Sequence, residues 1–485
     1  MGDILVEIPW GIVLIVLPLA AAIMTFLWPR IARPLALLCS LAIAVAVLGF
    51  AVQLWVHGPL HYPLGGWEPP LGIALYGDGL SLLLLTATAL VGLAVSVYAA
   101  AYFTVEKAGH FWPLWLFLLA ALNALFLSAD IFNLYVTLEL LGLAAVSLTA
   151  LTGGRAALGG AMRYLLVSLL GSLSYLLGVA LLYHAFGSVD IATLAARVAP
   201  VPAAWAALGL MSAGLVLKTA LFPLHFWLPP AHASAPAPVS AVLSALVIKA
   251  SFYILLRLWL TLFGPLGADL VAALLGWLGA AAVLWGSVQA LRQTRLKLLV
   301  AYSTVAQIGY LFLAFPLAAA MQTAWNAAAY LMLSHALAKA AMFMAAGNLL
   351  HFGGHDRIAD LDRLVQRLPI SAFAFALAGV SIMGLPPSGG FIGKWLLLET
   401  ALAQGRWDLA VVMLIGGLLA AAYVFKVLGK CFTQADMVHE PRAVPAPMEW
   451  AALLLACAAI LLGFVAMPVL SLLEIGAPFS GGEAP

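Results

Sequence analysis

The chain has 485 residues, of which 65% are hydrophobic and 8% are charged, and its formal net charge is +2. A soluble domain carries about 25% charged residues, so this composition excludes a soluble globular protein and indicates an integral membrane protein. The three cysteines are scattered without a CxxC motif, and no phosphate-binding glycine loop is present, so we expect no metal site, no cofactor and no nucleic-acid partner.

A helix needs about 20 apolar residues to cross a bilayer. The hydropathy pattern predicts fourteen such helices, near residues 5–28, 34–56, 78–103, 111–128, 131–150, 159–186, 203–225, 237–260, 268–290, 298–317, 323–350, 370–401, 408–431 and 447–473. The connections between them are short and leave no room for a soluble domain. The predicted fold is therefore an all-α membrane protein that forms one polytopic domain over residues 1–485.

The basic residues favour one set of connections over the other. Alternate connections carry Arg30 and Arg33, Lys107, Arg155 and Arg163, Arg292, Arg295 and Lys297, Arg357, Arg363 and Arg367, and Lys430 and Arg442. The opposite connections carry only Arg197 and Arg406. Because basic connections stay on the cytoplasmic side, both termini are expected outside, in the periplasm of a bacterium with the chain in its inner membrane.

Two of the predicted helices are interrupted by proline and glycine. Helix 7 ends in LKTALFPLHFWLPPAH, and helix 12 contains GVSIMGLPPSGGFIGKW. Proline in a helix interior removes a backbone hydrogen bond, and broken helices in corresponding positions are typical of inverted repeats with the transport route at their interface.

The corresponding positions of the two breaks indicate a chain of four parts. Three N-terminal helices (1–103) precede two inverted five-helix repeats, helices 4–8 (111–260) and helices 9–13 (268–431), and a last helix (447–473) follows. In this scheme Lys218 is the counterpart of Lys394, and Lys249 is the counterpart of Lys426.

Five ionisable residues lie deep inside the apolar helices: Glu139, Lys218, Lys249, Lys339 and Lys394. A charge near the bilayer centre costs roughly 2.5–3.5 kcal/mol, so these side chains are expected to face a wet or paired interior. A buried row of titratable groups is typical of proteins that move protons or cations.

Glu139 and Lys218 are the natural ion pair of this row. Paired with the lysine, the carboxylate can stay ionised, and separating the two would release a proton. The pair is therefore a switch for proton transfer, and the alternative is a static ion pair that locks two helices together.

Lys249, His335 and Lys339 form the expected middle of a proton relay. Lys249 lies too far from either helix end to reach water, and His335 and Lys339 share one helix face because they are four residues apart. Lys394, after the helix 12 break, is the expected exit. A static ion pair for the lysines and a helix–helix hydrogen bond for the histidine remain alternatives.

Six further polar residues are expected to play accessory parts: His225, His232, Ser244, Ser303, Gln307 and Lys426. The two histidines flank the helix 7 break and suit an entrance, although interfacial histidines also cap broken helix ends. Serine and glutamine suit the binding of water beside the lysines. Asp78 and Asp130 stand at predicted helix starts and are interpreted as N-caps.

Several stretches resemble the antiporter-like subunits shared by respiratory complex I, the multisubunit Mrp-type Na⁺/H⁺ antiporters and energy-converting hydrogenases. The similar stretches include DIFNLYVTLELLGL, LKTALFPLHFWLPPAHASAPAPVSAVLSALVIKASFYILLRLW, LLVAYSTVAQIGYL, SHALAKAAMFMAAGNLL and GLPPSGGFIGKWLLLE. The resemblance implies a fourteen-helix fold with two inverted repeats. It also implies that Glu139, Lys218, Lys249 and Lys394 occupy the family's proton-transfer positions.

The stretch around Lys249 is most similar to the D-type subunits of Mrp antiporters, whereas the stretch around Lys339 resembles hydrogenase subunits and the M and L subunits of complex I. The first function expected is proton translocation in an Mrp-type Na⁺/H⁺ antiporter, with other membrane subunits as partners and no catalytic cofactor in this chain. The alternatives are a proton-pumping subunit of a complex I-like (NADH:quinone oxidoreductase) or hydrogenase complex, a coupling subunit for inorganic carbon uptake, and a structural scaffold.

Overall fold

The computed structural model of the chain describes residues 8–68, 72–318, 322–434 and 441–476. In this part of the chain, thirteen helices are long and apolar enough to cross a membrane. The broken pair α18 (Pro369–Met383) and α19 (Gly389–Ala403) supplies the fourteenth crossing. The all-α membrane fold predicted from the sequence is therefore confirmed. The predicted start of the first helix at residue 5 lies outside the described residues, as do both chain ends.

The helices follow the predicted order with few shifts at their ends. The N-terminal helices are α2 (Trp10–Leu27), α3 (Ala32–His57) and α4 (Gly79–Tyr102). The first set of five crossings comprises α5 (Val105–Leu127), α6 (Ile131–Ala150), α7 (Gly154–Phe186), α9 (Pro202–Thr219) with α10 (Leu228–Ser234), and α11 (Ala237–Val242) with α12 (Ile248–Leu258). The second set comprises α13 (Asp269–Arg292), α14 (Leu296–Phe312) with α15 (Ala314–Ala318), α16 (Thr323–Gly353), the α18–α19 pair, and α20 (Trp407–Phe432).

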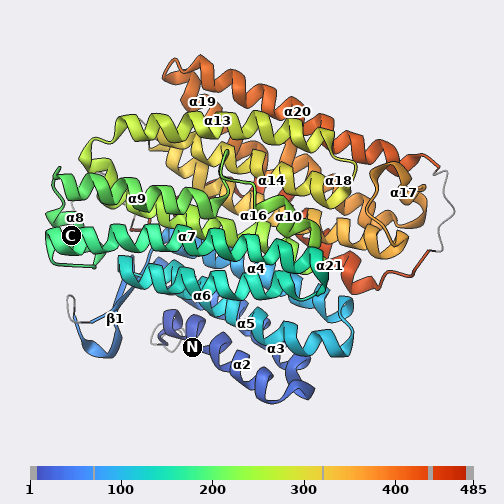
Figure 1. The fold of residues 1–485 in the computed structure, drawn as a ribbon, viewed down its shortest axis with the longest axis horizontal. Helices are drawn as coiled ribbons and strands as arrows, with labels where there is room; N and C mark the ends of the chain where they lie inside the picture. Colours follow the sequence, from blue (N-terminus) through green and yellow to red (C-terminus); the bar gives the residue numbers. More distant parts are fainter. Residues whose placement is uncertain (1–7, 69–71, 319–321, 435–440, 477–485) are drawn as a thin grey trace.

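Shorter elements join these helices. They are α8 (Ile191–Arg197) and α17 (Leu364–Arg367). In the last crossing, α21 (Ala446–Leu461) is followed by a 3₁₀ turn and α22 (Ala466–Leu472). Two π-helical turns, η3 (Leu243–Val247) and η4 (Trp259–Phe263), interrupt the predicted helix over 237–260. Figure 1 shows the long helices side by side along the longest axis of the molecule.

Side chains at the helix starts explain several boundaries. The carboxylates of Asp78, Asp130 and Asp190 accept backbone N–H groups at the starts of α4, α6 and α8, and the hydroxyl of Ser388 does so for α19. Such caps satisfy N–H groups that have no partner inside the helix. The interpretation of Asp78 and Asp130 as N-caps is therefore confirmed.

The two breaks have the same local geometry. Helix α9 ends at Ala220 and α18 ends at Gly384, both in the left-handed conformation, with φ of 59° and 81°. In each case the N–H groups of this residue and of the next one bond back to the preceding turn. These bonds satisfy carbonyls at the helix end, which makes a helix end tolerable inside a membrane.

The breaks correct the expected match between Lys218 and Lys394. With Ala220 aligned on Gly384, Lys218 corresponds to Ile382 and precedes the break, whereas Lys394 follows it on α19. The Nζ atom of Lys394 nevertheless reaches back 2.6 Å from the carbonyl oxygen of Ile382. Lys218 and Lys394 thus do not occupy equivalent positions of the chain, although the Lys394 amine contacts the residue that corresponds to Lys218.

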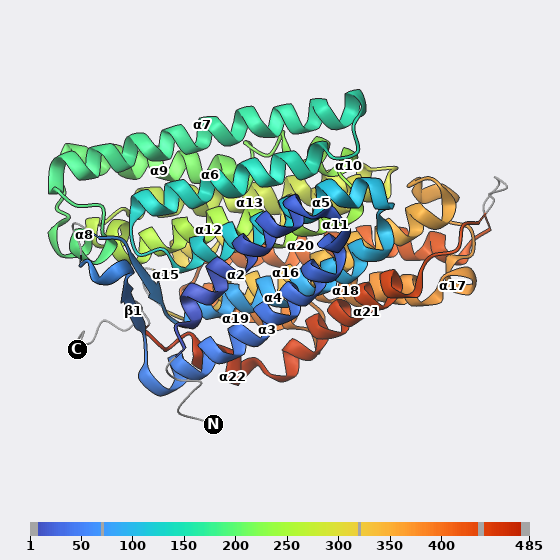
Figure 2. The same ribbon diagram turned by 90° about the horizontal axis from the view of Figure 1, so that it is seen from below.

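The connections gather at two opposite ends of the bundle. The end that carries the basic connections is here called the basic end. Four backbone hydrogen bonds tie its connections together, from the N–H of Leu296 to the carbonyl of Asp356, of Ile358 to Thr294, of Arg363 to Thr433 and of Arg442 to Phe352. The other end carries an antiparallel hairpin of β1 (Leu60–Pro63) and β2 (Ala74–Gly77), which the sequence analysis did not predict, and is called the hairpin end. Figures 1 and 2 show β1 and α17 at opposite ends of the molecule.

Burial is greatest along the middle of the bundle. Helix α16 and the helical stretch Ala237–Leu266 are the most deeply buried of the membrane-length segments, and the stretch Leu296–Ala318 that contains α14 is nearly as buried. In contrast, α2, α3, α7 and α20 expose many large apolar side chains, as expected for helices that face lipid. The ionisable residues of α12 and α16 therefore lie in the driest part of the protein.

Candidate functional site: a buried row of lysines

Glu139 and Lys218, which the sequence analysis paired, lie next to each other between α6 and α9. Their Oε1 and Nζ atoms are 3.4 Å apart, and Lys218 Nζ also donates to Ser172 Oγ at 2.5 Å. The lysine side chain is 6% exposed and the glutamate side chain 20%. The amine thus has a hydroxyl partner besides the carboxylate.

Lys249 is fully buried on α12, directly after the π-helical turn η3. Its Nζ donates to the carbonyl oxygen of Ser244 at 2.8 Å. A π-helical turn widens the spacing of the backbone hydrogen bonds and is frequent at functional sites. The Ser244 hydroxyl lies 2.8 Å from the hydroxyl of Thr304 on α14, so the surroundings of Lys249 continue into the next helix.

Lys339 is fully buried on α16 and reaches the same part of α14. Its Nζ donates to the carbonyl oxygen of Val300 and to the hydroxyl of Ser303, both at 2.6 Å. The Thr304 hydroxyl also donates to the Val300 carbonyl, at 3.1 Å. Lys249 and Lys339 are thus joined through Ser244, Thr304 and Val300.

His335 lies one turn before Lys339 on α16. It is 3% exposed, and neither ring nitrogen has a hydrogen-bond partner among the described residues. A buried polar group without a partner is costly and commonly marks a position where water binds. Gln307 on α14 has a buried side-chain nitrogen in the same situation.

Lys394 is the end of the row on the side of α19. Besides the Ile382 carbonyl, its Nζ faces the ring of Tyr310, with 4.3 Å between the nitrogen and the ring centroid. It lines a cavity of about 510 Å³ between α14, α18, α19 and α20, whose wall includes Trp395 and Leu418. Both of these side chains are strongly exposed, so the cavity opens on the side of the bundle.

The accessory residues fall into different surroundings. His232 on α10 is fully buried, stacks on Phe343 at 4.6 Å between ring centroids, and has no hydrogen-bond partner for either nitrogen among the described residues. The Phe343 ring also lies 5.6 Å from Lys339 Nζ, so His232 adjoins the row. His225 lies half-buried in the break between α9 and α10 and stacks on Phe222.

Lys426 does not join the row. Its Nζ donates to the carbonyl oxygens of Leu291 and Gln293 at 2.6 and 2.7 Å, where α13 ends. A lysine that binds the last carbonyls of a helix caps that end. Lys426 therefore makes different contacts from Lys249, and the expected match between these two lysines in the repeats stays a prediction.

Two buried cations were missed by the sequence analysis. Lys297, assigned there to a basic connection, is 3% exposed and donates to the Ala235 carbonyl between α10 and α11 at 2.5 Å. Arg257 on α12 makes a bidentate ion pair with Asp78 at the hairpin end. It also donates to the hydroxyl of Tyr253 at 2.9 Å. For Arg257 a sequence signal was available, because Lys249, Tyr253 and Arg257 follow one another at intervals of four residues and so share one helix face.

The side chains of the row suit proton transfer. Amines, imidazoles and hydroxyl groups can each accept and release a proton or orient water between them. The described residues offer no group of three or more His, Cys, Asp or Glu side chains that could hold a metal ion.

Comparisons with known proteins agree with this fold. The family model described as "NADH:quinone oxidoreductase/Mrp antiporter, TM" matches residues 128–420. The chain is 38% identical to NADH-quinone oxidoreductase subunit N of Desulforudis audaxviator (strain MP104C), over 87% of this chain and 86% of the relative. It is 29% identical to the D subunit of the Na(+)/H(+) antiporter of Bacillus subtilis (strain 168), over 81% of this chain and 80% of the relative.

A solved structure has the same fold over nearly the whole chain. It is a chain of the membrane-bound sulfane sulfur reductase, an archaeal respiratory membrane complex, with 28% identity and a TM-score of 0.90. The match covers 97% of each chain. The relatives thus include subunits of complexes with different overall reactions.

Proposed function

Since this chain belongs to the NADH:quinone oxidoreductase/Mrp antiporter transmembrane family, we propose that it translocates protons through its buried lysine row. The chain is an antiporter-like membrane subunit of an Mrp or complex I-like complex, and other membrane subunits are its partners. The family relation alone does not specify a route. The route is proposed from the contacts of the buried amines.

The link between Lys249 and Lys339 is the observation that carries this proposal. Two fully buried amines, on different helices, are linked by two hydroxyl groups, of Ser244 and Thr304, and two backbone carbonyls, of Ser244 and Val300. An isolated buried ammonium is costly, whereas a proton shared between two neutral-capable amines needs only one charge at a time. Such a pair is suited to hold one proton and to pass it on.

We place the remaining groups around this pair in the proposed route. A proton enters from the basic end near His232 and reaches Lys249, His335 and Lys339. It then leaves through Lys394, which lines the lateral cavity. In this proposal the ion pair of Glu139 and Lys218 controls the transfer, because separation of the carboxylate from the amine changes the electrostatic potential around Lys218.

The parent complex is proposed in two forms. In the first, the chain is the D-type subunit of an Mrp Na⁺/H⁺ antiporter, and proton movement is exchanged for sodium movement elsewhere in the assembly. In the second, it is a pump subunit of a complex I-like enzyme that receives redox energy from its partners. The greater identity to a subunit N, 38% against 29%, favours the second form.

The proposed location is the inner membrane of a bacterium, with the basic end on the cytoplasmic side and both termini outside. This orientation rests on the excess of arginine and lysine at the basic end.

The experiment that tests the function is purification of the native assembly, identification of every subunit and reconstitution into vesicles. Proton movement that depends on sodium supports the antiporter, and proton movement that depends on an electron donor supports the redox pump. An assembly that moves no protons under either condition contradicts both forms.

A further inference from the structure

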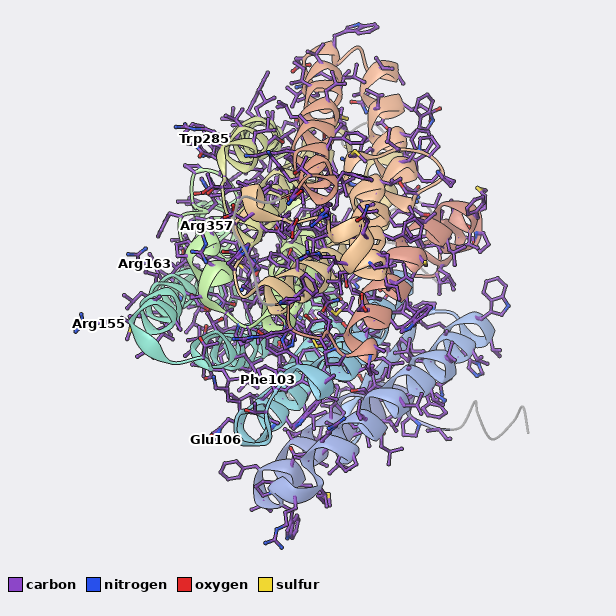
Figure 3. The ribbon with its side chains drawn as sticks, turned by 90° about the vertical axis from the view of Figure 1, so that its right-hand side faces the viewer. Phe103, Glu106, Arg155, Arg163, Trp285 and Arg357 are labelled. Carbon is purple, nitrogen blue, oxygen red and sulfur yellow. The ribbon has the colours of Figure 1, made fainter. Side chains whose placement is uncertain are left out.

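Two cavities open side by side at the basic end, and Phe103 lines both of them. The first, of about 250 Å³, is also lined by Arg30, Arg33 and Trp112. The second, of about 320 Å³, is also lined by Lys107 and His351, together with Tyr102, Thr104 and Thr152. Figure 3 looks onto this end of the molecule and labels Phe103. None of these residues belongs to the buried lysine row.

The ionisable groups of both cavities are all basic. Arg30 and Arg33 line the first cavity, Lys107 and His351 line the second, and neither lining set contains an aspartate or glutamate. Among the described residues, neither arginine has a carboxylate within ion-pair distance. The cavities therefore present several unneutralised donors to a ligand.

A buried donor adds to this set. Trp112, which lines the arginine cavity, is 1% exposed, and its indole Nε1 has no acceptor among the described residues. Most buried polar groups in proteins have a partner, so an orphan donor beside a basic cavity suits an acceptor that the chain itself does not supply.

The surroundings of the cavities are those of a membrane interface. Phe26, Leu27 and Trp28 precede Arg30 with only Pro29 between, and all three are strongly exposed. Exposed aromatic and apolar residues next to basic ones are typical of the depth at which lipid headgroups meet acyl chains. The remaining walls are largely apolar, with alanine, proline and Phe103 among them.

We propose that these two cavities bind the headgroup of an anionic phospholipid. A phosphodiester group lies against Arg30 and Arg33, since arginine donors match the oxygens of a phosphate, and a second anionic group lies against Lys107 and His351. Basic pockets between membrane helices are known to suit lipids of this kind. A lipid with two phosphodiesters, diphosphatidylglycerol, fills both cavities, whereas phosphatidylglycerol fills one.

A lipid headgroup and free phosphate both offer a phosphate group to the basic residues. The apolar walls of the cavities favour the lipid. A soluble phosphate would gain nothing from the exposed Phe26, Leu27 and Trp28, whereas the acyl chains of a lipid would cover such side chains. The site is independent of the proposed proton route, because the hydrogen bonds of Lys249, Lys339 and Lys394 among the described residues go to other groups.

The test measures lipid binding by the purified native assembly in nanodiscs of phosphatidylcholine. Diphosphatidylglycerol, phosphatidylglycerol and inorganic phosphate are added separately, and bound lipid is counted by native mass spectrometry. We expect the double variant R30Q/R33Q to weaken diphosphatidylglycerol binding at least tenfold. We expect K107Q to make diphosphatidylglycerol no better than phosphatidylglycerol.

The matched control is the double variant R155Q/R163Q. Both arginines are exposed near the start of α7 at the same end, and Figure 3 labels them away from Phe103. This control removes the same number of charges and should leave lipid binding unchanged. An equal loss in the control would mean nonspecific attraction and would overturn the proposal.

Three further results would also overturn the proposal. They are unchanged lipid binding in R30Q/R33Q, displacement of the lipid by inorganic phosphate at equal concentration, and an acidic segment of a neighbouring subunit crosslinked into the cavities. Assembly of each variant is checked by its subunit content, so that loss of lipid is separated from loss of the complex.

Discussion

The hydroxyl groups of Ser244 and Thr304 lie 2.8 Å apart and join the surroundings of two fully buried lysines, Lys249 and Lys339. The contact crosses from the α11–α12 stretch to α14. It stands in the part of the bundle where burial is greatest.

Removal of this contact should slow proton movement. We expect Thr304→Val to lower proton flux in vesicles roughly threefold to tenfold, because one hydrogen bond contributes about 0.5–1.5 kcal/mol and a factor of ten in rate corresponds to about 1.4 kcal/mol. The control is Thr149→Val, since Thr149 is equally buried but donates only to the Ala145 carbonyl of its own helix. Equal flux in the two variants would exclude Thr304 from the route.

The ion pair of Glu139 and Lys218 should act as a unit. We expect Glu139→Gln and Lys218→Met each to reduce flux more than tenfold, and the double variant to lose little more than either single variant, because residues of one pair are not additive. Glu399→Gln changes an exposed glutamate on α19 and serves as the control. Normal flux per assembled complex in Lys218→Met, with poor assembly, would instead support a structural scaffold.

The ring of Tyr310 should matter more to Lys394 than its hydroxyl group. Tyr310→Phe keeps the ring 4.3 Å from Lys394 Nζ but loses the hydrogen bond to the Met413 carbonyl. We therefore expect nearly normal flux and a thermal stability lower by about 1 kcal/mol. Tyr310→Leu removes the ring as well and should also reduce flux, since a cation over an aromatic ring gains about 0.5–2 kcal/mol. Equal flux in the two variants would remove the ring from the exit.

The buried pair of Asp78 and Arg257 should be a structural element of the hairpin end. Replacing one partner leaves a charge buried without compensation, so we expect Asp78→Asn to destabilise the protein by about 3–5 kcal/mol. Asp408→Asn breaks the exposed pair with Arg406 and should cost about 0–1 kcal/mol. Thermal unfolding of the assembly measures both, and similar midpoints would show that the buried pair contributes no more than a surface pair.

Much of the fold could be predicted from the sequence because two signals are strong. Apolar segments of membrane length identify the helices, and proline with glycine identifies the breaks at Pro223 and Pro387. The β1–β2 hairpin was missed, since each strand has four residues and its pairing depends on contacts far along the chain, such as Leu75 with Ser128.

The ionisable row could be predicted because a charge in an apolar helix is conspicuous by itself. The hydrogen bonds that link the members of the row could not be predicted. The π-helical turn before Lys249 depends on a hydrogen-bond pattern that composition does not encode. Lys297 follows Arg292 and Arg295, so the sequence places it in an exposed basic connection. Its burial comes from the packing of the α10–α11 junction at Ala235 against α14.

The most direct test of the proton route compares Lys249→Ala with Lys430→Ala in the reconstituted native assembly. Lys249 is fully buried in the row, whereas Lys430 is an exposed lysine near the end of α20. With equal subunit content in both preparations, the route predicts that proton flux is lost in Lys249→Ala and kept in Lys430→Ala. Wild-type flux in Lys249→Ala would contradict it.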